Sequence, residues 1–194
     1  IRTAAGAFFD IKVIGKGGHG AFPQFAIDPI TIAAEIIGAI QTIISRTTSP
    51  NDSAVLSITK VHAGDAYNVI PESAMLSGTV RTFAIDKMQE IERQMISISE
   101  GISKAHGGNA LVEFNTLFLP VLNEEEATDL ATDVCRDMVG QDNVITTGSA
   151  GTGSEDFSFM SNEIPGCYVI IGNGEDSNAL HNPNFDFNDE ALVY

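Results

Sequence analysis

Strand-like and helix-like segments follow one another in a fixed order through the first part of the chain: strand, helix, strand, strand, helix, strand. Residue alternation and a high content of β-branched and aromatic residues mark the strands at 7–15, 53–61, 73–83 and 110–119. This order is typical of the split βαβ unit, in which two helices cover one face of a four-stranded sheet. We therefore expect an α+β fold that begins with a ferredoxin-like βαββαβ domain over residues 1–118.

Each of the two helical patterns begins at an aspartate, which can accept hydrogen bonds from the first free backbone N–H groups of a helix. Asp28 precedes Pro29, and Asp86 is followed three residues later by Gln89, as in a capping box. Apolar residues at three- and four-residue spacing predict the buried stripes: Ile30, Ala33, Ile37, Ile40 and Ile44 in the first helix, and Met88, Ile91, Met95, Ile98, Ile102 and Ala105 in the second.

Residues 119–194 contain too little regular structure for an independent core. Asn123 is placed to cap a helix with three glutamates in its first turn, and Gly140 is expected to end that helix. Its predicted apolar stripe is Leu130, Ala131, Val134 and Met138. One further segment, CYVIIG at 167–172, is typical of a buried strand. We interpret this region as part of a larger α/β domain.

Charge is distributed unevenly between the two parts. The chain has 10 Lys and Arg against 26 Asp and Glu, a net charge of −16. Only Arg136 offsets the acids after residue 115. Phosphate contacts need clustered cations, so nucleic acid is not an expected partner. The acidic surface is interpreted as solvated, and the alternative is that it faces a metal or other cations.

Cysteine content and hydropathy limit further the class of protein that this chain can belong to. Cys135 and Cys167 are interpreted as buried free thiols. No apolar run approaches the ~20 residues that a membrane-spanning helix needs, so no membrane partner is expected. The chain begins with IRTAAGAFFD and carries no targeting signal that can be read, and a cytoplasmic location is the working expectation.

The segment VIGKGGHGAFPQ (13–24) raises the alternative of nucleotide binding. It contains G-x-G-x-x-G at Gly15, Gly17 and Gly20. A dinucleotide-binding turn needs a helix that starts within the motif, whereas Pro23 follows it and the next helix cannot begin before about Asp28. Nucleotide binding is therefore set aside. The glycines favour a functional role for His19 over that of an ordinary surface histidine, because they would let the backbone approach a ligand.

Four segments together resemble a known family. They are GKGGHGAFPQFAIDPI, AGDAYNVIPESAMLSGTVRTF, GSEDFSF and LHNPNFDFNDE. In this order they are similar to the metallo-aminoacylase and carboxypeptidase superfamily, in particular its branch of N-acyl-amino-acid, hippurate and indoleacetyl-amino-acid hydrolases. The resemblance implies a catalytic α/β domain that binds two divalent metal ions (Zn, Mn, Co or Ni) and an inserted ferredoxin-like lid that forms a homodimer. Residues 1–118 resemble the lid, and 119–194 resemble the last segment of the catalytic domain.

The resemblance also implies roles for single residues. His19 matches a lid histidine that reaches the partner's active site and polarises the scissile carbonyl. Asn68 and Arg81 match residues that bind the free α-carboxylate of the substrate, which suits the fork geometry of a guanidinium. From the residues alone, Arg81 would be an exposed strand residue.

His181 matches a metal ligand, and Asp186 or Asp189 could orient it. From the residues alone, a single loop histidine would not be taken for a ligand. The loop at 151–158 is expected near the site, without a chemical role.

The segments that would carry the other metal ligands and the general-base glutamate do not occur in this sequence. We expect the chain to be part of a dinuclear metal-dependent amidohydrolase that cleaves N-acyl amino acids, and to be inactive alone. The alternatives are a metal-dependent exopeptidase on dipeptides and a non-catalytic dimerisation or ligand-binding module.

Overall fold

A four-stranded antiparallel sheet organises the first part of the chain in the computed structural model, which describes residues 2–174 and 177–193. Its strands are β1 (Ala5–Ile14), β3 (Ala54–Ala63), β5 (Ser73–Thr82) and β6 (Asn109–Phe118). They lie in the order β3-β5-β1-β6, so the first and third long strands are the inner pair. The expected ferredoxin-like arrangement is confirmed, and each strand ends within a few residues of its predicted limit.

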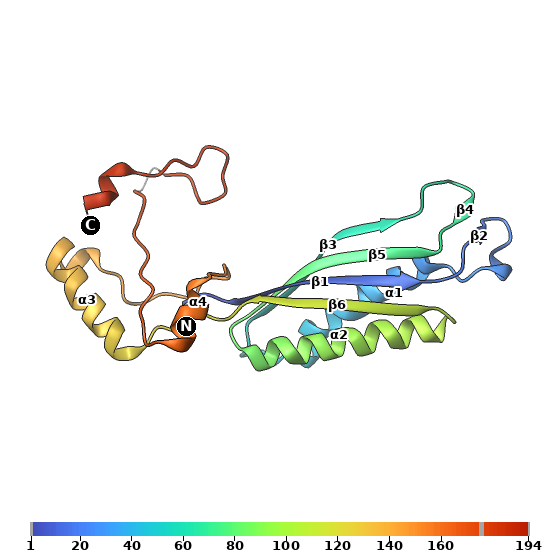
Figure 1. Cartoon of the computed structure of the whole chain (residues 1–194), viewed down its shortest axis with the longest axis horizontal. Coiled ribbons are helices and arrows are strands. Elements are labelled where there is room, and N and C mark those ends of the chain that lie inside the picture. The colour runs from blue at the N-terminus through green and yellow to red at the C-terminus, as the bar shows by residue number, and fades with distance from the viewer. Residues whose placement is uncertain (1, 175–176, 194) are drawn as a thin grey trace.

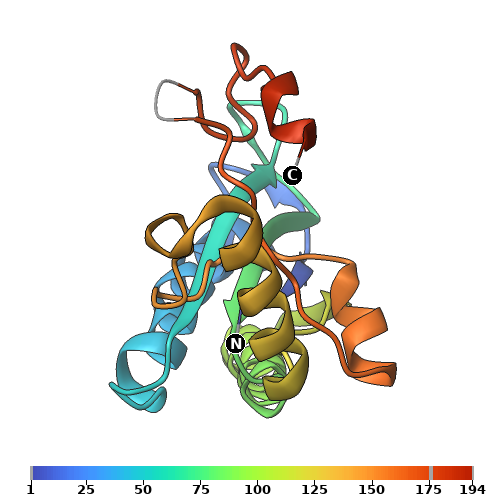
Figure 2. The same ribbon diagram turned by 90° about the vertical axis from the view of Figure 1, so that its left-hand side faces the viewer.

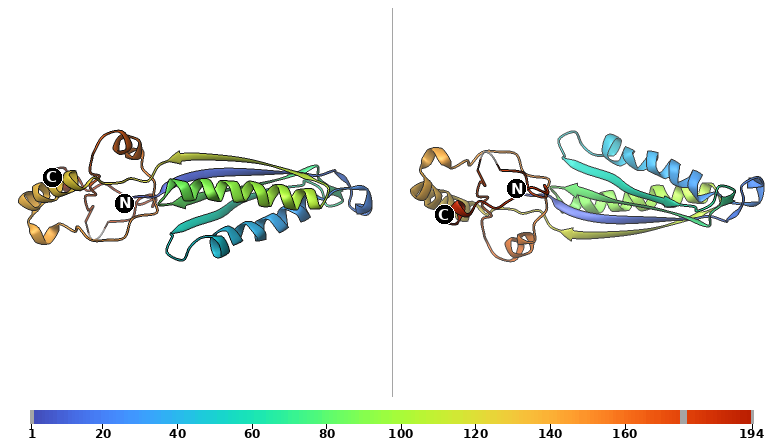
Figure 3. Two further views of the ribbon diagram at one scale, coloured as in Figure 1. Left: turned by 90° about the horizontal axis from the view of Figure 1, so that it is seen from below. Right: turned by 90° about the horizontal axis from the view of Figure 1, so that it is seen from above.

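Two helices cover one face of this sheet and leave the other face open (Figure 3). They are α1 (Pro29–Thr42), which continues into the π-helix η2 (Ile43–Thr47), and α2 (Ile85–Ala105). Alternate strand residues meet the helices in a core whose largest members are Phe9, Ile11, Val13, Ile32, Ile36, Ile40, Ile43, Leu76, Val80, Met88, Ile91 and Met95. Each large apolar side chain buried in this way contributes about 1.5–3 kcal/mol of transfer free energy.

The apolar stripe of α1 differs from the prediction. Ile32 and Ile36 are fully buried, whereas Ile30 is 46% exposed and Ile37 and Ile44 are only partly buried. Isoleucines occur on more than one side of this helix, so spacing alone could not select the buried face. The helical stretch at 29–47 is also longer and more apolar than the sequence analysis predicted, since no apolar run of membrane-spanning length was expected. By length and hydropathy it could cross a membrane, but here its buried side packs on the sheet.

The two helices begin differently. Asp28 caps α1 as predicted, and its Oδ1 accepts a hydrogen bond from Ile30 N at 2.9 Å. For α2 the predicted cap at Asp86 is wrong, because the N-cap is Ala84 and Asp86 lies in the first turn. The stripe of α2 is confirmed at Met88, Ile91 and Met95, but its last predicted member, Ala105, is exposed. The end of the helix at 106–108 is as predicted, with Gly107 at φ 79°.

A small two-stranded ribbon projects from one end of the main sheet and was not predicted. It consists of β2 (Gly18–His19) and β4 (Val69–Ile70), paired antiparallel (Figure 1). We call residues 15–25 and 64–72, which include this ribbon, the tip. The opposite end of the sheet, where β1 begins and β5 ends, is called the base.

The acidic part of the chain lies beyond the base (Figures 1 and 2). It contains α3 (Glu125–Val139), α4 (Phe157–Glu163) and the short 3-10 helices η3 (Gln141–Asn143) and η4 (Asp189–Val193). No residue of α3 is buried, and three members of its predicted apolar stripe, Leu130, Val134 and Met138, are exposed. The predicted strand at 167–172 is wrong, because the segment pairs with no strand among the described residues and Ile170 is 60% exposed.

The start and end of α3 test two further predictions. The predicted cap Asn123 is wrong, and Glu124 occupies this position instead. Its carboxylate accepts hydrogen bonds from Ala127 N at 2.8 Å and Glu126 N at 3.1 Å. These bonds lower the pKa of Glu124 from its ordinary value, the bond from Ala127 most. Gly140 ends α3 as predicted, with φ 88°.

Candidate functional site

His19 lies at the tip, exposed to solvent and held by its own turn. Its backbone pairs with Val69 in the β2–β4 ribbon, and its Nδ1 accepts a hydrogen bond from Ala21 N at 3.1 Å. The Phe22 ring lies 5.3 Å from the imidazole, centroid to centroid. Because Nδ1 is an acceptor here, the neutral ring carries its proton on Nε2. The Nε2–H group is thus free to donate to a ligand.

The glycines around His19 make room for the chain's own backbone. A Cβ at Gly15 would lie 2.1 Å from the Ile27 carbonyl oxygen, and one at Gly17 would lie 3.0 Å from that of Ile70. Gly20 donates its N–H to the Asn68 carbonyl at 2.8 Å. The sequence argument that these glycines let a ligand approach the backbone is therefore wrong. Gly15 lets the chain pack against Ile27, and Gly17 and Gly20 let it pack against Ile70 and Asn68 in the facing segment of the tip. This packing holds the turn that carries His19.

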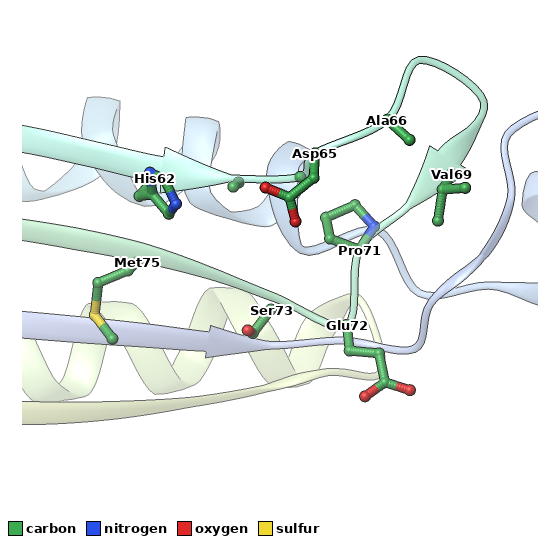
Figure 4. Close-up of a pocket in the computed structure, with 10 residues that line it drawn as sticks. His62, Asp65, Ala66, Val69, Pro71, Glu72, Ser73 and Met75 are labelled. Carbon is green, nitrogen blue, oxygen red and sulfur yellow. The ribbon is translucent and has the colours of Figure 1, made fainter.

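Asn68 is the second predicted site residue at the tip, in the exposed turn before β4. Next to it is a pocket of about 420 Å³ between the ends of β3 and β5 (Figure 4). Val69, directly opposite His19 in the ribbon, lines this pocket, and directly opposed side chains lie on the same side of a ribbon. The pocket therefore adjoins the imidazole side of the tip.

Arg81 lies near the base, on the open face of the sheet, and is half-buried. Its Nη1 donates to the carbonyl oxygens of Val80 at 2.9 Å and Ala7 at 3.4 Å, and to Thr79 Oγ1. The guanidinium carbon lies 5.7 Å from the centre of the Phe8 ring. No Asp or Glu of the described residues forms an ion pair with Arg81, and its recorded bonds leave Nη2 and Nε free. In so acidic a chain, an unpaired guanidinium is available for an external anion.

The loop at 151–158 lies next to Arg81. Gly151 N donates to the Arg2 carbonyl, and Ala4 N donates to the Gly153 carbonyl, both at 3.0 Å. A pocket of about 390 Å³ opens beside Arg81 between the start of β3, the end of β5 and this loop.

Ser154 is a residue of this loop that sequence reasoning did not select. Its Oγ is buried and has no hydrogen-bond partner among the described residues. A Cβ on Gly6 would lie 2.6 Å from this Oγ and 3.3 Å from Arg81 Nη1. The hydroxyl and the guanidinium therefore share the space that Gly6 leaves. Only the spacing between the loop and the first strand, which the sequence does not give, could have shown this.

The predicted site residues fall into two groups at opposite ends of one chain. His19 and Asn68 lie together at the tip. Arg81 lies near the base, and β5 from Ser73 to Arg81 spans roughly 26 Å at about 3.3 Å per residue. Asn68 and Arg81 of the same chain therefore cannot hold one carboxylate together.

His181, the predicted metal ligand, lies in an exposed turn with φ 67°. Among residues 2–174 and 177–193, no group of three or more His, Cys, Asp and Glu side chains is arranged to hold a metal ion. No bond of His181 to Asp186 or Asp189 is recorded in these ranges. The described residues therefore do not form a dinuclear site by themselves. Cys135 and Cys167 are free as predicted, but half-buried rather than buried.

Comparison with known proteins places this geometry in a family. Residues 4–107, more than half of the chain, match the M20 peptidase dimerisation domain. The chain belongs to the M20 family. Its matched range includes the whole tip, all of α1 and α2, and three of the four long strands.

Two curated relatives match this M20 chain over nearly its whole length. An IAA-amino acid hydrolase ILR1-like 4 from Arabidopsis thaliana is 34% identical, over 98% of this chain and 45% of its own. A hippurate hydrolase from Campylobacter jejuni is 35% identical, over 95% of this chain and 48% of its own. The chain thus spans about half the length of the curated relatives it matches.

Among solved structures, the M20 chain is similar to the Bacillus subtilis YxeP protein, described as a dinuclear metal-binding peptidase of the M20 family. The TM-score is 0.78 at 30% identity, covering 99% of this chain and 47% of the other. The similarity extends beyond the dimerisation domain into residues 119–194, and the expected family resemblance is confirmed.

Proposed function

We propose that this chain is part of a metal-dependent amidohydrolase that cleaves the amide bond of N-acyl amino acids. The observation that carries the proposal is Arg81, a half-buried guanidinium with no acidic partner among the described residues, beside a pocket and the 151–158 loop. A guanidinium fork binds a carboxylate through two parallel hydrogen bonds, so the free α-carboxylate of the substrate is its proposed ligand.

The proposed donor to the scissile carbonyl is His19 Nε2–H. A donor placed at a developing oxyanion lowers the barrier by about 3 kcal/mol. Because tip and base are far apart in one chain, the proposed active site joins Arg81 of one protomer to His19 and Asn68 of its partner. Two copies related by a two-fold axis and lying side by side, with their sheets antiparallel, would bring each tip to the other's base.

The edge strand β3 is the proposed contact between the two copies. It lies on the α1 side of the sheet, and α1 with its continuation η2 carries the incompletely buried isoleucines Ile30, Ile37 and Ile44 at seven-residue spacing. An apolar helix surface next to an unpaired strand edge suits the interface of a homodimer.

Metal ions in this proposed enzyme would activate the attacking water. His181 is the one ligand that we propose from this chain, and the remaining ligands would come from outside it. In the full-length enzyme, His181→Ala should reduce the bound metal measured by elemental analysis, whereas His19→Ala should leave it unchanged. Equal metal content in His181→Ala and the parent enzyme would contradict the assignment.

The test of the proposed function is Arg81→Ala in the full-length enzyme, assayed with an N-acyl amino acid and with its C-terminal amide. The parent enzyme should prefer the free acid, and the variant should lose that preference through a higher KM. A charge-assisted pair contributes about 1.5–3 kcal/mol, so the loss should be at least about tenfold. If the preference survives in Arg81→Ala, the carboxylate assignment is wrong.

A dipeptide exopeptidase would bind a free carboxylate in the same way, and turnover of dipeptides compared with N-acyl amino acids separates the two activities.

A further inference from the structure

Thr79 lies two residues before Arg81 on β5, so the two side chains share the open face of the sheet. Both are half-buried there. Phe8 is directly opposite Thr79 on β1, and its ring centre lies 5.7 Å from the guanidinium carbon of Arg81. Thr79 and Phe8 therefore border the guanidinium on the side away from the base.

The Thr79 hydroxyl forms two hydrogen bonds at this position. It accepts one from Arg81 Nη1, and it donates one to the Ala7 carbonyl oxygen at 3.0 Å. A hydroxyl has a single proton, so the bond to Ala7 leaves only the oxygen lone pairs for Nη1. The hydroxyl is thereby oriented as an acceptor for the guanidinium, and it links Arg81 on β5 to the backbone of β1.

The recorded hydrogen bonds of the guanidinium all involve one of its nitrogens. Nη1 also donates to the carbonyl oxygens of Val80 at 2.9 Å and Ala7 at 3.4 Å, whereas the bonds recorded among the described residues involve neither Nη2 nor Nε. The N–H groups of Nε and Nη2 point in parallel, which is the geometry that binds a carboxylate bidentately. Because Nη1 is already held, this long and flexible side chain loses less conformational entropy when a carboxylate binds to the free edge.

We propose that Thr79 is a positioning residue for the carboxylate site: its hydroxyl holds Nη1 and so presents the Nε and Nη2 groups of Arg81 to the substrate. The proposal rests on the proposed function, because it assumes that Arg81 binds the free α-carboxylate of an N-acyl amino acid. Thr79 itself does not touch the substrate in this proposal, and its effect is exerted through Arg81 alone.

The decisive variant is Thr79→Val, which keeps the β-branched shape and removes only the hydrogen-bonding hydroxyl. In the full-length enzyme, KM for the N-acyl amino acid should rise roughly three- to tenfold, the range of one lost hydrogen bond. kcat should stay the same, because the carboxylate is bound equally in the ground and transition states. KM for the C-terminal amide should not change, because the amide lacks the charge that Arg81 binds.

Two further variants separate positioning from stability. Thr79→Ser retains a hydroxyl and should keep KM for the free acid close to the parent value. Thr116→Val is the matched control, because it makes the same change at an exposed position of β6, which is not paired with β5. A purely structural role would lower the thermal midpoint of Thr79→Val and leave the ratio of the two KM values unchanged, and that outcome would overturn the proposal. A parent enzyme without preference for the free acid would instead contradict the proposed function.

The contact itself can be tested on the 194-residue chain, independently of activity. Denaturant unfolding of Thr79→Val, Arg81→Ala and the double variant completes a double-mutant cycle. If the hydroxyl holds the guanidinium, the double variant should lose less stability than the two single variants lose in sum. The corresponding cycle of Thr116→Val with Arg81→Ala should be additive. An additive cycle for Thr79 would overturn the proposal, whatever the substrate preference of the parent enzyme.

Discussion

Gly6 illustrates how a missing side chain can place two functional groups. Its Cα lies under both the Ser154 hydroxyl and the Arg81 guanidinium, and any Cβ there would overlap the first and crowd the second. Its backbone does not have a positive φ, so conformational freedom is not the reason for glycine here. The reason is space, as it is at Gly15 and Gly17 in the tip.

Gly6→Ala should therefore destabilise the chain by about 1–3 kcal/mol, the usual range for overpacking. The matched control is Gly101→Ala in α2, where nothing lies within 4 Å of the added Cβ and stability should rise by about 0.5–1 kcal/mol. Thermal or denaturant unfolding of the 194-residue chain measures both. Equal stability of the two variants would show that Ser154 and Arg81 do not occupy the space above Gly6.

Single residues could be predicted from the sequence only where a motif carried them. The sequence selected His19, but for a wrong physical reason, because its glycines serve backbone packing. It missed Ser154, whose position beside Arg81 depends on contacts between segments far apart in the chain. The roles of Asn68, Arg81 and His181 stay predictions.

At the scale of elements, periodicity and turn residues predicted the first 118 residues well. All four long strands and both covering helices were found, because each alternates between a packed and an open side within this chain. The error at Asn123 arose because several polar residues near the start of α3 can cap it, whereas α2 begins at Ala84 without any side-chain cap. The choice among the polar residues depends on tertiary bonds, such as those between Asn123 and residue 168. The segment at 167–172 failed because a strand needs a neighbour, and none of the described residues provides one.

The cap of α3 gives this helix a pH dependence. Glu124 has a lowered pKa in the folded chain, so its contribution to stability is complete above its ordinary value of 4.5 and is lost as the pH falls through the folded value. Amide exchange at Ala127 should therefore accelerate, relative to the sheet, as the pH falls below about 4.5.

Glu124→Gln should remove most of this pH dependence, because an amide does not titrate. Glu125→Gln, also in the first turn of α3, is the matched control and should retain it. Site-resolved hydrogen exchange, corrected for the intrinsic rate at each pH, provides the measurement. The cap assignment fails if both variants behave alike.

At the scale of the whole molecule, the chain is one well-packed α+β domain joined to a region whose helices bury little. All the residues of the main core cluster lie before residue 115, whereas α3 exposes Leu130 by 68%. The sequence predicted this difference from the sparse pattern after residue 119. It could not predict that the candidate site residues divide between tip and base. Which residues lie at the same end of the sheet follows from the direction and pairing of the strands, and the sequence does not give these.

That division has a genetic consequence. If each active centre takes Arg81 from one subunit and His19 from the other, two inactive alleles can rescue each other. Co-expression of full-length His19→Ala and Arg81→Ala chains should yield hybrids in which one centre carries both substitutions and the other carries neither. With random assortment, roughly a quarter of all centres would be intact, so activity should return to about a quarter of the parent level. A mixture as inactive as either variant alone would place both side chains in the same subunit's centre.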